Sequence, residues 1–130
     1  MSTSPASVPY VEPWLRGTHT DIPAVGRGVL HAFDLALDDI TKWTEGLTDL
    51  EVHAQPLGLS SVSFHLKHIA RSIDRLLTYA EGGQISADQL ARLKTEQTGC
   101  ETLAELLAEV ETSLSNARSE ERRVGKECVP

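Results

Sequence analysis

The chain has 130 residues, of which 40% are hydrophobic and 24% charged, a composition typical of one small globular domain. Twelve Lys and Arg against nineteen Asp and Glu give a net charge of -7, which repels phosphate backbones and anionic membrane surfaces. No window reaches the roughly 18 apolar residues of a membrane span, and no signal peptide is visible. We therefore expect a cytoplasmic protein with no nucleic-acid and no membrane partner.

Residues 1–20 are predicted to form an extended arm. Three prolines and Gly17 lie in this segment, and such a composition resists both helix and strand formation. The arm also carries four apolar side chains that are unusual in a free tail: Tyr10, Val11, Trp14 and Leu15. It is therefore expected to lie across the body of the domain.

Apolar residues spaced three and four apart indicate three main helices. Thr20 or Asp21 is the expected N-cap of the first, which Gly46 would end, and Ser60 or Ser61 is the expected N-cap of the second. The predicted apolar segments cover residues 22–47, 62–80 and 103–117. No stretch alternates with period two, so the predicted class is all-α, with three main antiparallel helices.

Two capping-box patterns lie between the second and third helices. Ser86 is followed three residues later by Gln89 and predicts a short helix, and Thr98 followed by Glu101 has the same form. In such a box the two side chains reciprocally bind the first free backbone N–H groups. The second box is therefore expected to begin the third main helix.

The composition changes abruptly at residue 118. The last thirteen residues, RSEERRVGKECVP, carry four basic and three acidic residues, and the apolar stripe stops there. The segment is similar to translated vector or adaptor sequence, and the alternative is a natural solvated tail. We therefore expect a helical domain over residues 21–117 and a non-native or disordered tail over 118–130.

Five histidines are the candidates for metal or proton chemistry. His19 in the arm and His53 in a loop are expected to be solvated. His31 lies opposite the apolar stripe of the first helix, beside Asp34 and Asp38, so a surface ion pair is its expected role.

His65 and His68 are three residues apart on the second predicted helix. This spacing can bring two imidazoles to one ion, although an HxxH pair alone is a weak signal. His68 shares its helix face with Phe64 and Tyr79 and is expected to project toward a groove beside them. A histidine at a helix interface and a metal ligand are both open interpretations.

The segment GLSSVSFHLKHIARSIDRLLTYAEG resembles the DinB/YfiT-like superfamily, and the resemblance covers about residues 12–117. It implies an up-down-down-up four-helix bundle, with a divalent metal, often nickel or zinc, bound by one His of the second helix and two of the last. The resemblance places the first ligand on His68, with His65 as the alternative. No HxxxH pair follows Ala117, so the fourth helix is expected to be missing or replaced by the unrelated tail.

The resemblance also implies a function. Family members with a known reaction are mostly thiol-dependent transferases or isomerases, in which a metal holds a low-molecular-weight thiol as the thiolate. We expect a metal-dependent enzyme of this type that acts on a small molecule in a full-length parent and is incomplete and inactive as given. No catalytic residue is predicted. The alternative is a non-catalytic helical module that self-associates, for example as a homodimer.

Overall fold

The computed structural model describes residues 8–127, with side chains as far as Val124. The described residues form two 3-10 turns, three long helices and two short ones: η1 (Pro13–Leu15), α1 (Ala24–Thr44), α2 (Asp49–His53), η2 (Pro56–Gly58), α3 (Val62–Ala80), α4 (Ala87–Lys94) and α5 (Leu103–Glu127). No strand occurs among them, which confirms the all-α prediction. No described helix combines the length and the apolar character needed to cross a membrane.

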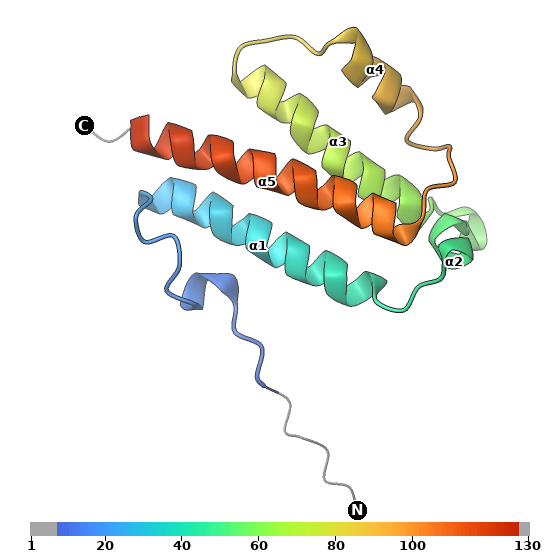
Figure 1. The fold of residues 1–130 in the computed structure, drawn as a ribbon, viewed down its shortest axis with the longest axis horizontal. Helices are drawn as coiled ribbons and strands as arrows, with labels where there is room; N and C mark the ends of the chain where they lie inside the picture. The colour runs from blue at the N-terminus through green and yellow to red at the C-terminus, as the bar shows by residue number, and fades with distance from the viewer. Residues whose placement is uncertain (1–7, 128–130) are drawn as a thin grey trace, which may run out of the picture.

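The three long helices lie side by side, with α5 between α1 and α3 (Figure 1). Helix α1 runs antiparallel to α5. Asp49, a few residues beyond the C-terminus of α1, accepts a hydrogen bond from the N–H of Leu103 at the start of α5, so these two helix ends lie close together. Helices α3 and α5 run parallel, because the segment after α3, which contains α4, carries the chain back to the starting end of α3. The expectation that the three main helices are antiparallel was therefore wrong for this pair.

The order of the long helices is up, down, down. This order matches the first three helices of the predicted up-down-down-up bundle. A fourth long helix is not among residues 8–127. That it is missing or replaced in the protein stays a prediction.

Helix α5 continues through the predicted domain boundary at residue 117. Ala117 itself is fully buried, and Arg118 and Arg122 on the next two turns form ion pairs with Asp34 and Asp21. The structure thus continues α5 through residues 118–127, and that this segment is non-native stays a prediction. Residues 128–130, and the first seven residues of the predicted arm, lie outside the described residues.

Helix α5 supplies much of the apolar core. Its buried residues recur every three or four positions and therefore lie on one face; they are Leu106, Val110, Leu114 and Ala117. Leu66 and Ala70 of α3 and Val52 of α2 pack into the same cluster, with partly buried α1 residues around it. The core is therefore built around the last long helix of the described chain.

Local capping signals account for most helix starts. The Ser61 hydroxyl caps α3 by accepting a hydrogen bond from the N–H of Phe64 at 3.0 Å, and Ser86 forms its predicted capping box with Gln89. The box predicted from Thr98 and Glu101 does not form, because the Glu101 carboxylate turns to Lys67. Helix α5 begins instead behind Thr102, whose hydroxyl accepts from the N–H of Glu105 at 3.2 Å.

The described part of the arm lies against α1 as predicted, but the four apolar side chains on which the prediction rested are exposed: Tyr10, Val11, Trp14 and Leu15. Pro13 of η1 is buried. The Tyr10 hydroxyl and the Arg16 guanidinium both donate to the Asp38 carboxylate, at 3.0 and 2.7 Å. The hydrogen bond from Arg16 lowers the pKa of Asp38 below its ordinary value. The arm is therefore held to α1 by the buried Pro13 and by a charged contact.

Candidate metal centre

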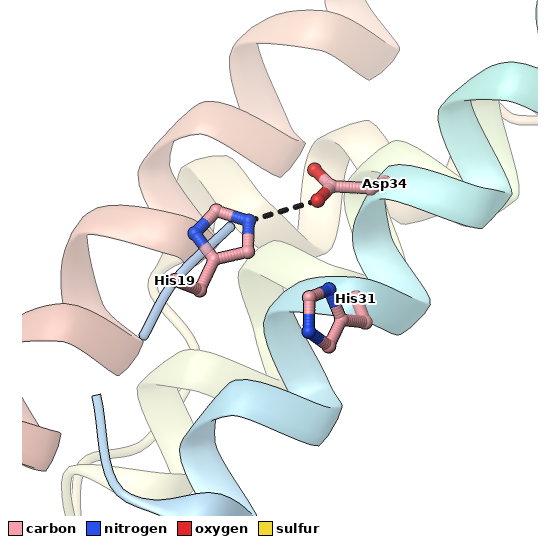
Figure 2. Close-up of side chains that lie close together, drawn as sticks. All are labelled: His19, His31 and Asp34. Atoms are coloured by element: carbon pink, nitrogen blue, oxygen red, sulfur yellow. Dashed lines mark hydrogen bonds and ion pairs between the residues drawn. The ribbon is translucent and has the colours of Figure 1, made fainter. Parts of the chain in front are cut away.

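Three side chains that could bind a metal ion meet beside the N-terminal half of α1 (Figure 2). His31 and Asp34 both come from α1, and their spacing of three residues puts them on one face of the helix. His19 comes from the linker between η1 and α1, which folds back over that face. We call these three residues the α1 cluster.

A strained turn places His19 in the cluster. Gly17 and His19 both have positive φ values, 72° and 57°, and this conformation costs a non-glycine residue about 1–2 kcal/mol. The turn continues to Ile22, which is buried close to Gly26, where a Cβ would approach the Ile22 side chain to 3.0 Å. The same turn makes α1 begin at Ala24, after Pro23, and not behind Thr20 or Asp21 as predicted.

The geometry of the α1 cluster is close to that of a metal site. One potential ligand atom from each residue lies within 4.8 Å of the other two. His19 Nε2 is 2.8 Å from Asp34 Oδ2, and the two imidazole centroids are 5.3 Å apart at 55°. Ligands about 2.1 Å from a tetrahedral zinc ion lie about 3.4 Å from one another. The three side chains are therefore close enough to bind one ion after side-chain rotation and loss of the hydrogen bonds that His19 now forms.

His31 carries the clearest sign that the cluster has a ligand-binding role. Its side chain is 7% exposed, and its buried Nδ1 has no hydrogen-bond partner among the described residues. A buried polar atom without a partner costs about 1–3 kcal/mol, and most such atoms in proteins are satisfied. An ion bound by this nitrogen would remove the cost.

Two arginines of α5 border the α1 cluster. Arg118 donates to Asp34 Oδ1 at 3.0 Å. Arg122 donates to His19 Nδ1 at 2.6 Å and forms an ion pair with Asp21 at 3.2 Å. The cluster is therefore a polar network that joins the arm, α1 and the C-terminal half of α5.

His68, the ligand implied by the family resemblance, lies elsewhere on α3. Its ring stacks on Phe64 with centroids 5.5 Å apart, and its Nδ1 donates to the Glu96 carboxylate at 3.0 Å. Burial alone raises the pKa of Glu96, but hydrogen bonds from Arg75 and His68 outweigh this effect and leave that pKa below its ordinary value. His68 thus has one carboxylate partner.

His65 is exposed and meets the edge of the Phe64 ring. The described side chains bring no third metal-binding residue together with His65 and His68, and the α1 cluster is the only group of three among them. The role of His65 and His68 as ligands stays a prediction.

Three histidines were placed wrongly from the sequence. His31 is buried and forms no surface ion pair. A helical wheel shows only the residues of α1 itself, so it could not indicate that the arm covers the face opposite the apolar stripe. His19 is mostly buried in its contacts with Asp34 and Arg122. His53 Nε2 donates to the carbonyl of Glu101 at 2.7 Å and is not simply solvated. The apolar arm and the spacing of His31 and Asp34 were the signals that together could have indicated the cluster.

The fold and the α1 cluster together define an all-helical protein with a candidate divalent-metal centre. Comparison with known families identifies it further. Residues 32–124 match the DinB superfamily, and the chain belongs to that superfamily. The match includes Asp34, His68 and Arg122 but not His19 and His31. No curated protein and no solved structure matches the chain.

Proposed function

We propose that this DinB-superfamily domain binds a divalent transition metal at the α1 cluster and uses it to activate a low-molecular-weight thiol. The observation that carries the proposal is that ligand atoms of His19, His31 and Asp34 lie within 4.8 Å of one another, and the unpartnered buried Nδ1 of His31 supports it. Two imidazoles and one carboxylate suit zinc or nickel better than magnesium or calcium, which prefer oxygen ligands.

The donor set also suits catalysis. Three protein ligands leave an open position on the metal, as in catalytic zinc sites. A metal in such a site supplies Lewis acidity, so that an added thiol is held as the nucleophilic thiolate. In this chain, His31 would be held by α1, and Asp34 would contribute the negative charge. Arg118 would orient the Asp34 carboxylate through its other oxygen.

The alternative location for the metal is His68, supported by the family resemblance and by the adjacent Glu96 carboxylate. Arg75 already occupies the second oxygen of Glu96 at 2.8 Å. A site there has two donors and would need a third ligand from outside the described residues. The donor count therefore favours the α1 cluster.

Calorimetric titration of the whole chain with Zn²⁺ and Ni²⁺ tests the proposal. We expect weak binding, with Asp34→Asn and His31→Gln each weakening it further by about tenfold or more, because even changes to outer-shell residues commonly cost about 10- to 100-fold. Matched changes at the other site, His68→Gln and His65→Gln, should leave the affinity unchanged.

Two results would contradict the proposal. Loss of binding in His68→Gln alone would move the metal to α3. Tight binding of Mg²⁺ by the wild-type chain would show that the imidazoles take no part. A circular dichroism spectrum of each variant controls for loss of helix.

A second candidate function is self-association, which exposed apolar side chains on the long helices support. Leu76 and Tyr79 of α3 and Trp43 of α1 are largely exposed, and exposed apolar groups of this kind favour association. Light scattering over a concentration series should then show dimers, and Leu76→Gln should weaken them. Leu57→Gln, at a still more exposed position in η2, is the matched control. A monomer at every concentration would exclude this function.

A further inference from the structure

The hydrogen bonds around His19 fix which of its ring nitrogens carries the proton. Arginine can only donate hydrogen bonds, so His19 Nδ1, which is 2.6 Å from Arg122 Nη2, must be the acceptor. The proton of the neutral ring is then on Nε2, from which it is donated to Asp34 Oδ2 at 2.8 Å. Figure 2 shows this bond between the two side chains.

Neither nitrogen of His19 is therefore free to bind a cation. A metal at Nε2 would have to replace the proton, and the ring could then stay neutral only by carrying a proton on Nδ1, which faces the donor Arg122. A metal at Nδ1 would take the place of Arg122 directly. Both routes require the guanidinium to leave.

Arg122 has a second partner besides His19, and its side chain is accessible to solvent. Its Nη1 forms an ion pair with Asp21 at 3.2 Å, and the Arg122 side chain is partly exposed on the C-terminal half of α5. Its positive charge also opposes a second cation nearby. We propose that Arg122 and a divalent metal compete for His19, so that the C-terminal half of α5 regulates metal occupancy of the α1 cluster. This inference rests on the proposed function.

The test compares Zn²⁺ binding by wild type, Arg122→Met and Lys94→Met. Both substitutions remove one positive charge, but Lys94 is an exposed residue of α4, a helix that lies on the opposite side of α3 and α5 from α1 (Figure 1). We expect Arg122→Met to bind Zn²⁺ about tenfold more tightly and Lys94→Met to bind like wild type. The gain should disappear in the double variant Arg122→Met/His31→Gln, because the tighter binding occurs at the cluster.

A second readout does not depend on metal. Nitrogen-15 NMR of the histidine rings should show His19 of the wild-type chain as the Nε2–H tautomer, and the Nδ1 resonance should shift in Arg122→Met. If wild type binds Zn²⁺ through His31 and Arg122→Met binds no more tightly, the competition is overturned and the metal site stands. If neither chain binds Zn²⁺, both proposals are overturned.

Discussion

Replacing Leu106 with alanine is expected to destabilise the protein by about 3 kcal/mol, because Leu→Ala changes in well-packed cores cost about 2–5 kcal/mol. Leu106 of α5 is 1% exposed and lies in the cluster formed with Leu66 and Ala70 of α3. The truncation would leave a cavity between the two parallel helices. Urea denaturation followed by circular dichroism measures the change.

The matched control is Leu90→Ala on α4, where the leucine is 41% exposed. It removes the same atoms but leaves no enclosed cavity, so the expected loss is below about 1 kcal/mol. Equal losses in the two variants would show that Leu106 does not pack as the structure has it.

Replacing Lys67 with methionine is expected to cost about 2 kcal/mol, because it removes the buried donor of two partly buried hydrogen bonds. Lys67 is 1% exposed although it carries a charge. Its Nζ donates to the carbonyl of Thr98 and, at 3.2 Å, to the Glu101 carboxylate. These bonds hold the segment before α5 against α3. Thermal unfolding measures the loss, and Lys94→Met is the control for removal of an exposed lysine.

The effect of Lys67→Met should depend on pH. Burial alone raises the pKa of Glu101, but its own backbone N–H and Lys67 outweigh burial and leave that pKa below its ordinary value. A carboxyl with a lowered pKa stabilises the fold above its unfolded pKa, and this stability is lost as the pH falls through the folded pKa. The stability difference between wild type and Lys67→Met should therefore shrink below about pH 4. A constant difference would mean that Glu101 takes no part.

Local signals predicted the elements of the fold well. The bounds of α3 follow from the Ser61 cap and the apolar stripe behind it, and α4 follows from the capping box of Ser86. Such signals act within one or two turns, so they can be read from adjacent residues. The parallel course of α3 and α5 depends on where the intervening segment travels, which no local pattern specifies.

The candidate metal site was predicted poorly for a related reason. The pattern around His68 indicated the superfamily correctly, but the three donors that the structure brings together come from the arm and α1. Asp34 and His31 can be paired by helical spacing, whereas His19 joins them only through a turn with a positive φ value. The contact with Arg122 spans 103 residues of sequence.

The central position of α5 has a consequence for how the chain is made. Helices α1 and α3 are synthesised first, yet the residues that bury their apolar faces begin at Leu103. A growing chain therefore carries two amphipathic helices that lack their main partner until α5 is complete, and incompletely folded chains with exposed apolar surface are prone to aggregate. Folding of these helices consequently has to wait for α5, and the yield of folded protein should depend on how soon α5 reaches α1 and α3.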